Sequence, residues 1–351
     1  MEKLTKLLHD TPAIEITDKD KFVIMSDLHM GNGHTIDDFR HNGDFLHYVL
    51  ENVYEKDDYS LILNGDIEEL HRFSLHSITS RWQGIYKIFK RFYLRQKLVK
   101  LFGNHDYELS LKKKHPFNIP VEEAVKLRYN RNDLFIFHGH QASPYFNKVI
   151  HWFISIILRF FANLLRIKNY TVAQNNRKKF KIEKHVYDFA RKNKIMAIIG
   201  HTHRPLFESL SKKEALKFKI ENLCREYPSS SPGQKEILER RIKKYKIELM
   251  DIINKREEED LISTLYNSSS EPLVPCMFNS GCVIGKSGFT TIEISHGFIR
   301  LVYWFDSSIS KKYLDFNGYK PQQVNDTPYY RVVLKEDSLD YLFARIRLLS
   351  D

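Results

Sequence analysis

Cysteine is scarce in this chain. The three cysteines, Cys224, Cys276 and Cys282, are an odd number in 351 residues and do not have the spacing of a zinc finger. Their scarcity and spacing argue against a disulfide-stapled scaffold and a thiolate zinc site. They also predict a reducing compartment, so the cytoplasm is the expected location.

Glycine and proline are also few, at 14 and 11 residues, which excludes a collagen-like or linker-dominated chain. We find no self-similar period of the kind that indicates a solenoid. The first 22 residues contain no uninterrupted apolar run, so we expect neither a signal peptide nor a membrane anchor there. With 42% hydrophobic and 28% charged residues, the chain is expected to form a single globular domain over residues 1–351.

Positive charge is concentrated in two segments, although the net charge of the chain is only +11. Residues 141–194 hold twelve Lys or Arg against two acidic residues, and residues 81–100 hold seven basic residues and no acidic one. A concentrated positive field predicts an anionic partner.

Short apolar runs recur along the chain, each followed by a loop rich in Asp, Asn, His and Gly. Each run has the length of a buried strand, and the runs are FVIM, SLILN, KLVKLF, LFIF and KIMAII. Between them, helical periodicity is expected at residues 37–53, 82–95 and 121–128. Strands that alternate with helices predict an α/β sheet core.

Three segments depart from this alternation. Residues 144–194 are expected to form a basic and apolar helical cap; within it, residues 146–167 fit either a core helix or an interfacial helix over the site. Residues 211–272 are charge-dense and predict a helical hairpin inserted into the domain. Residues 307–351 are expected to form a C-terminal tail that packs back on the core.

Five polar motifs follow the apolar runs: SDLH, NGDIEE, GNHD, FHGH and GHTH. In an extended loop, side chains at positions i and i+2 project to the same side, so each DxH or HxH pair can converge on one ion. One such pair is a weak signal, but five motifs at strand ends predict a metal centre. The polar side chains that these motifs offer to a metal are Asp27, His29, Asp66, Glu69, Asn104, His105, Asp106, His138, His140, His201 and His203.

The chemistry of these donors indicates which metals they would bind. Carboxylate, imidazole and amide oxygen without thiolate suit manganese, iron or zinc, of which we favour manganese. There are too many ligands for one tetrahedral site, so two ions are expected, and the two oxygens of Asp66 make it the natural bridge. Two ions about 3.5 to 4 Å apart can hold a hydroxide and clamp an in-line displacement at phosphorus.

The order DxH, GDxxE, GNHD, H and GHxH resembles the signature of the calcineurin-like metallophosphoesterase superfamily. This resemblance implies a four-layer αββα sandwich. It also implies that Asp66 bridges a first metal held by Asp27, His29 and His203 and a second held by Asn104, His138 and His201. His105 would be the catalytic residue that stabilises or protonates the leaving oxygen, oriented by Asp106.

Within the superfamily, GHTHRP and the basic stretch before it look most like bacterial UDP-diacylglucosamine hydrolases, which cleave a lipid-linked pyrophosphate at the cytoplasmic membrane surface. Here GNHD and HGH replace the GNRD and HGD typical of those enzymes. We expect His140 and Glu69 to support the site rather than to bind metal.

These observations predict a dimetal hydrolase of phosphoesters or pyrophosphates. Its expected substrate is lipid-linked or membrane-proximal, with the protein at the periphery of an anionic membrane. The alternatives are a protein Ser/Thr phosphatase, a nuclease and a non-catalytic interaction module. A nuclease would need its basic patches to form a track for the nucleic-acid backbone.

Overall fold

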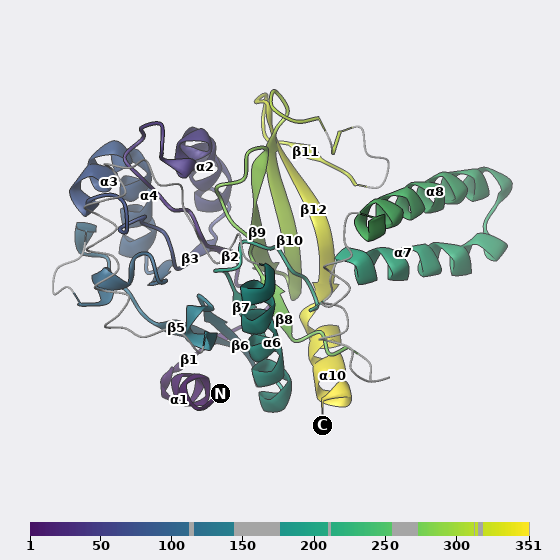
Figure 1. Ribbon diagram of the computed structural model, residues 1–351, viewed down its shortest axis with the longest axis horizontal. Helices are drawn as coiled ribbons and strands as arrows, with labels where there is room; N and C mark the ends of the chain where they lie inside the picture. Colours follow the sequence, from purple (N-terminus) through teal and green to yellow (C-terminus); the bar gives the residue numbers. More distant parts are fainter. Residues whose placement is uncertain are drawn as a thin grey trace.

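Two β-sheets pack face to face in the computed structural model, and helices cover the outer side of each (Figure 1). The structure describes residues 1–111, 116–143, 176–209, 212–254, 273–311, 313–314 and 319–350. Both expectations about architecture, an α/β core and a four-layer arrangement, are confirmed by these layers.

The larger sheet has seven strands in the order β11-β12-β10-β9-β2-β3-β4. Strands β2, β3 and β4 are parallel, so their carboxyl ends meet at one edge of the sheet, whereas β9, β10 and β12 form an antiparallel ribbon. The strands are β2 (Phe22–Met25), β3 (Ser60–Asn64), β4 (Leu98–Leu101), β9 (Gly288–Ser295), β10 (Phe298–Asp306), β11 (Gln322–Gln323) and β12 (Tyr329–Ser338).

The smaller sheet has five strands in the order β1-β5-β6-β7-β8, and β6, β7 and β8 are parallel. Its strands are β1 (Ala13–Ile16), β5 (Ala124–Tyr129), β6 (Asn132–Phe137), β7 (Met196–Ile199) and β8 (Met277–Asn279). The helix expected at residues 121–128 is wrong, because that segment forms β5. Its Val125 and Leu127 are buried opposite β6, so sheet packing overrides the local helical pattern.

Alternation along each strand divides the apolar residues between two cores. In β2, Phe22 and Ile24 belong to the inner core, which joins the two sheets and three helices, α1 (Glu2–Asp10), α6 (Asn176–Asn193) and α10 (Leu339–Leu349). Val23 and Met25 belong to the outer core, under α2 (Gly43–Val49), α3 (Leu75–Arg81) and α4 (Gln83–Leu94). This follows from the period of two residues that a strand imposes on its side chains.

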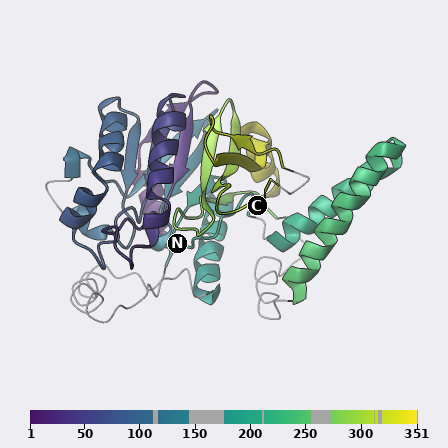
Figure 2. The same ribbon diagram turned by 90° about the horizontal axis from the view of Figure 1, so that it is seen from above.

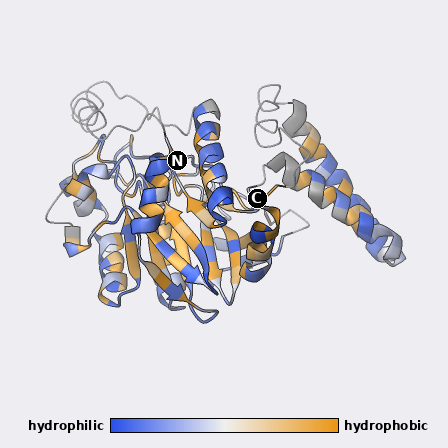
Figure 3. Cartoon of the chain, turned by 90° about the horizontal axis from the view of Figure 1, so that it is seen from below, coloured by the Kyte–Doolittle hydropathy of each residue, from blue (hydrophilic) through white to orange (hydrophobic). Residues whose placement is uncertain are grey.

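A helical hairpin extends away from the sheets (Figures 1 and 2). It consists of α7 (Lys212–Glu226) and α8 (Pro232–Asn254), which pack on each other through a small core of their own, Leu216, Leu223, Leu238 and Tyr245. Figure 3 shows apolar residues gathered in the strands, whereas hydrophilic and apolar residues alternate along the hairpin.

The remaining expected segments are described only in part. Residues 144–175 and 255–272 lie outside the described residues, and with them the expected helix at 146–167. Within 307–351, β12 completes the larger sheet and α10 packs into the inner core. None of the helices in the described part of the chain has the length and apolar character needed to span a bilayer.

Candidate metal centre

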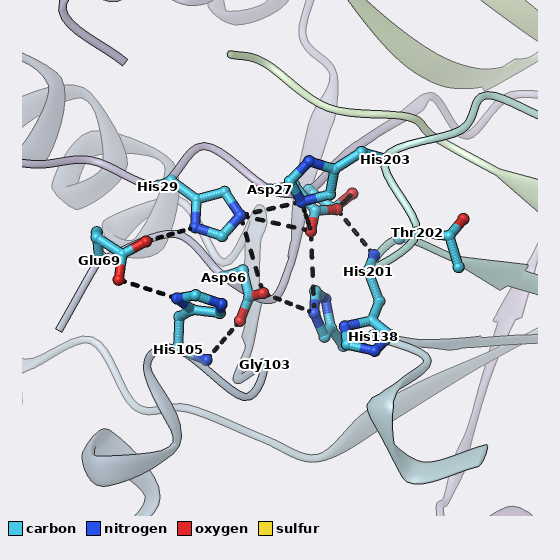
Figure 4. Close-up of polar contacts among 12 residues, drawn as sticks. Asp27, His29, Asp66, Glu69, Gly103, His105, His138, His201, Thr202 and His203 are labelled. Carbon is cyan, nitrogen blue, oxygen red and sulfur yellow. Dashed lines mark hydrogen bonds and ion pairs between the residues drawn. The ribbon is translucent and has the colours of Figure 1, made fainter. Parts of the chain in front are cut away.

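The loops that follow β2, β3, β4, β6 and β7 bring the five sequence motifs together (Figure 4). They meet because these strands end at the same side of the two packed sheets. Asp27, His29, Asp66 and His138 are almost completely buried, and His203 lies at the half-buried rim.

A first group of donors consists of Asp27, His29 and His203. Asp27 Oδ1 lies 3.1 Å from His203 Nε2 and 3.8 Å from His29 Nε2, and the two ring nitrogens are 3.1 Å apart. Three donor atoms, two from the loop after β2 and one from the loop after β7, therefore converge on one point.

A second group consists of Asp66, His138 and His201. Asp66 Oδ2 lies 3.1 Å from His138 Nε2 and also 3.9 Å from His29 Nε2 of the first group. Asp66 thus lies between the two groups, in the position that a bridging carboxylate needs. Asn104 is in the neighbouring loop after β4, between Gly103 and His105.

Unsatisfied polar atoms test whether these residues fit divalent ions. Among the described residues, Asp27 Oδ1 and Asn104 Oδ1 are buried without a hydrogen-bond partner of acceptable geometry. His29 Nδ1 donates to Glu69 Oε2 at 3.0 Å and His138 Nδ1 donates to the Asn64 carbonyl at 2.8 Å, so the Nε2 atom of each ring faces the cluster. Burial opposes charge on His138, but Asp66 and Asp27 raise its pKa to about 9, so metal binding at this Nε2 must displace a proton. Such atoms are costly to bury unless a cation satisfies them, and oxygen and imidazole donors suit divalent metals. The residues therefore fit the metals that the motifs predict.

Burial and the charges within the cluster set the protonation states of three predicted ligands. Burial raises the pKa of Asp27, but the neighbouring His203 and His138 outweigh this effect and hold that pKa at about 2. Burial, with His138 alongside, lowers the pKa of His201 to about 3, which leaves that ring neutral. Burial opposes protonation of His203, but Asp27 raises its pKa to about 10, so metal binding there must displace a proton.

The backbone is strained at five of the seven predicted ligands. The φ angles of the five residues are positive, between 46° and 64°: Asp27, His29, Asp66, His201 and His203. For residues other than glycine this conformation costs about 1 to 3 kcal/mol each and persists only where the surroundings enforce it. Hydrogen bonds supply that enforcement, since Asp27 Oδ2 accepts from the His201 amide at 2.9 Å and Asp66 Oδ1 accepts from the His105 amide at 2.8 Å.

Two motif glycines allow the loops to approach this closely. A Cβ atom on Gly103 would lie 2.1 Å from Asp66 Oδ1, and one on Gly200 would lie 2.3 Å from Ser26 Oγ. Both distances are far inside van der Waals contact, so only glycine fits at either position.

Glu69 connects the metal groups to His105. It is fully buried, accepts from His29 Nδ1 through Oε2, and accepts from His105 Nδ1 through Oε1 at 2.9 Å. The hydrogen bond fixes the His105 ring and leaves its Nε2 available to a substrate. Glu69 was expected only to support its loop, and the structure shows which two side chains it supports.

The expected orientation of His105 by Asp106 is wrong. The Asp106 carboxylate accepts from the backbone amides of Gly103 at 2.6 Å and Ile67 at 2.7 Å, so it joins two motif loops instead. Its short side chain turns back to the amide three residues earlier, while the longer Glu69 reaches the imidazole.

His71 and His140 complete the surroundings. The His71 ring lies 4.3 Å from the His105 ring, and the donor atoms of His71, Glu69 and His105 lie within 4.8 Å of one another. Sequence reasoning missed His71, although its place two residues after Glu69 repeats the i, i+2 spacing of the other motifs. His140 is buried with its ring 5.5 Å from that of His138, beside the second group.

Comparisons with known proteins support this interpretation. The family profile described as calcineurin-like phosphoesterase matches residues 20–205, more than half of the chain, a range that includes all five motifs. No protein with a curated description matches this chain. A crystal structure of a Vps29 single mutant from Entamoeba histolytica is 10% identical, with a TM-score of 0.29, and the match covers 82% of this chain and 92% of that one. A TM-score this low supports no inference from that structure.

Proposed function

Since this chain belongs to the calcineurin-like phosphoesterase family, we propose that it hydrolyses phosphoester or pyrophosphate bonds with two divalent metal ions. The observation that carries the proposal is the convergence of two donor groups on either side of the Asp66 carboxylate. Three parallel strands of one sheet and two of the other end at this point, so the groups are held by the fold itself.

The ligand assignment follows the two groups. Asp27, His29 and His203 would hold one ion, Asn104, His138 and His201 the other, and Asp66 both. When bound, such ions polarise phosphoryl oxygens and lower the pKa of water. Manganese, iron and zinc all suit oxygen and imidazole donors, and we propose manganese.

His105 is the proposed proton donor. Burial opposes its charge, but Glu69 and Asp66 raise its pKa to about 9, which favours a protonated ring at neutral pH. With Nδ1–H held by Glu69 Oε1, the proton on Nε2 is the one that can pass to the leaving oxygen.

The proposed substrate is lipid-linked or membrane-proximal, and the proposed location is the cytoplasm, at the surface of an anionic membrane. The support is compositional, because the sequence of residues 146–167 combines many apolar residues with Lys and Arg, and α6 continues the basic segment with Lys178 and Lys181 exposed. The proposed partners are therefore a phosphorylated lipid-linked substrate and the membrane itself.

A nuclease is less favoured, because acidic residues neutralise much of the basic segment at 81–100. Arg91 and Arg95 pair with Glu55 at 2.6 and 2.9 Å, and Lys97 pairs with Asp58 at 2.5 Å. These cations are already partnered on the surface over β3 and β4, so they do not form a continuous track for a nucleic-acid backbone.

The test is hydrolysis by the full chain after chelation and reloading with manganese, iron or zinc. The substrates are p-nitrophenyl phosphate, its diester, a phosphopeptide, DNA, and a lipid-linked pyrophosphate in mixed micelles. We expect metal-dependent turnover, fastest on the lipid-linked substrate. Turnover on none of them with both metals bound would instead support a non-catalytic interaction module.

Asp66→Ala provides the matching variant, because it removes the one ligand shared by the two groups. We expect it to lose activity and both ions, as measured by elemental analysis of the purified protein. Asp133→Ala, which removes a carboxylate paired with Arg128 beside the turn between β5 and β6, is the control and should retain both ions. Retention of two ions in Asp66→Ala would contradict the bridging assignment.

A further inference from the structure

A buried carboxylate of α6 reaches the loop that carries His201 and His203. Glu183 lies in a run of basic residues, yet it is fully buried. Its Oε1 accepts from Thr202 Oγ1 at 2.8 Å and from Arg204 Nε at 3.3 Å, and its Oε2 accepts from the terminal nitrogen of Arg204.

The partners of Glu183 alternate with the predicted ligands along the chain. Thr202 lies between His201 and His203, and Arg204 follows directly. In Figure 4, Thr202 points away from the ligand cluster while His201 and His203 point into it. Holding the intervening side chains on one side therefore keeps the two imidazoles on the other.

A second set of contacts holds the same loop from β8. Asn279 Nδ2 donates to Thr202 Oγ1 at 2.9 Å and to the Gly200 carbonyl at 3.0 Å. The Thr202 hydroxyl can accept from Asn279 and donate to Glu183 at once, so both contacts use one rotamer of that hydroxyl. The Arg204 guanidinium also lies over the Phe180 ring of α6, 4.8 Å from its centre.

These contacts restrain the backbone at His201 and His203, which has an unfavourable conformation. His201 and His203 have φ angles of 64° and 56°. A left-handed conformation at two non-glycine residues in one short loop requires restraint by the surroundings. His201 belongs to one metal group and His203 to the other, so a relaxed loop would disturb both.

We propose that Glu183 is a positioning residue of the metal centre, which holds the loop at 200–204 in the conformation that directs His201 and His203 at the metals. The inference rests on the proposed function, because it requires that this centre binds metal. It also gives Arg204 a role, since the guanidinium pairs with Glu183 and helps to hold the same loop. Through Glu183, α6 is linked by hydrogen bonds to the loop that carries His201 and His203.

The test compares Glu183→Gln with Glu293→Gln in the full chain. The amide of Glu183→Gln keeps the shape but loses the charge that faces Arg204. Glu293 is a matched control, since it is also buried and pairs with Arg331 at 2.5 Å and the Tyr54 hydroxyl at 2.9 Å. Among the described residues, its polar contacts lie within the larger sheet and its outer helical cover, and none is with a ligand loop. Both variants should lose comparable stability, because each breaks a buried ion pair.

The measurements are calorimetric binding of Mn²⁺ to the metal-free chain and the visible spectrum of the Co²⁺-loaded chain. We expect Glu183→Gln to weaken Mn²⁺ binding by about 10 to 100-fold, the usual effect of removing an outer partner of a metal site, and to alter the Co²⁺ spectrum. Glu293→Gln should lower the melting temperature and leave both metal measurements as in the unaltered chain.

Three outcomes would overturn the proposal. If Glu183→Gln binds Mn²⁺ with unaltered affinity and an unaltered Co²⁺ spectrum, Glu183 has only a structural role. The same conclusion follows if Glu293→Gln loses as much Mn²⁺ affinity as Glu183→Gln. If Glu183→Gln does not fold, Thr202→Val decides, because it removes the hydroxyl contact at nearly constant volume and should weaken Mn²⁺ binding as well. If the unaltered chain binds no metal, the proposed function fails together with this inference.

Discussion

At the residue scale, the centre consists of imidazoles and carboxylates whose outer hydrogen bonds fix how each side chain is presented. His29 and His138 donate through Nδ1 to Glu69 and to the Asn64 carbonyl, so each presents Nε2 to the cluster. Glu69 does the same for His105. One buried carboxylate thus orients a ligand of the first metal group and the proposed proton donor.

His105→Ala is expected to retain both metals and to lower kcat by about 10² to 10⁴, the range for loss of a positioned acid or base. The loss should be smaller for p-nitrophenyl esters, because p-nitrophenolate leaves without protonation. Steady-state kinetics on a series of leaving groups, with metal analysis, measures both effects. His76→Ala, at an exposed position of α3, is the control. An equal loss for good and poor leaving groups would contradict proton donation.

The sequence predicted the residues of this centre better than it predicted their contacts. The apolar runs and the polar motifs that follow them can be read in the local sequence. The choice of seven ligands among the polar residues of those motifs came from the resemblance to the superfamily. Which carboxylate orients His105 depends on loop geometry, and the adjacent Asp106 was the natural but wrong choice. His71 had no motif of its own, and only the packing of its ring on His105 reveals it.

At the element scale, the strands were predicted where apolar runs were short and ended in polar loops. The helix predicted at residues 121–128 was wrong because their polar and apolar residues fit a helical period. Their pairing as β5 with β1 and β6 can be seen only in the folded sheet. The hairpin of α7 and α8 follows from charge-dense periodicity on both sides of a Pro and Ser-rich turn. The positive φ angles of the ligand loops have no equivalent sequence signal, since Asp and His occupy positions usual for glycine.

Gly103→Ala is expected to disable the centre without unfolding the sheets. The added methyl would lie 2.1 Å from Asp66 Oδ1, so either the bridging carboxylate or the loop after β4 must move. A displacement of about 1 Å can cost about 10²-fold in rate, and we expect at least this loss together with reduced metal content. Gly233→Ala in the first turn of α8, where a Cβ would meet nothing within 4 Å, is the control. Normal metal content in Gly103→Ala would contradict this tight packing.

At the scale of the whole molecule, the functional centre belongs to the two-sheet core and the hairpin stands apart from it. The inner and outer cores meet at the larger sheet, whereas the buried residues of the hairpin form a separate cluster. Near its base, Tyr313 and Tyr319 lie beside α8, where burial, a neighbouring phenol and Glu248 raise the pKa of both side chains to about 12. The hairpin therefore contacts the core at one end, and most of its stability comes from packing between α7 and α8.

Replacing residues 214–251 by a short Gly and Ser linker should therefore leave the metal centre intact. We expect two ions per chain, unchanged kcat on p-nitrophenyl phosphate, and a melting temperature lower by no more than about 4 °C. A loss near 1 kcal/mol lowers the melting temperature by about 2 to 4 °C in domains of about 150 to 250 residues, and by less in a larger chain. The contrasting control deletes α10, whose Leu342, Phe343 and Ile346 lie in the inner core, and that variant should not fold. If the hairpin replacement loses metal or melts as early as the α10 deletion, the hairpin and the core form one cooperative unit, and the hairpin must then be counted among the elements that hold the ligand loops in place.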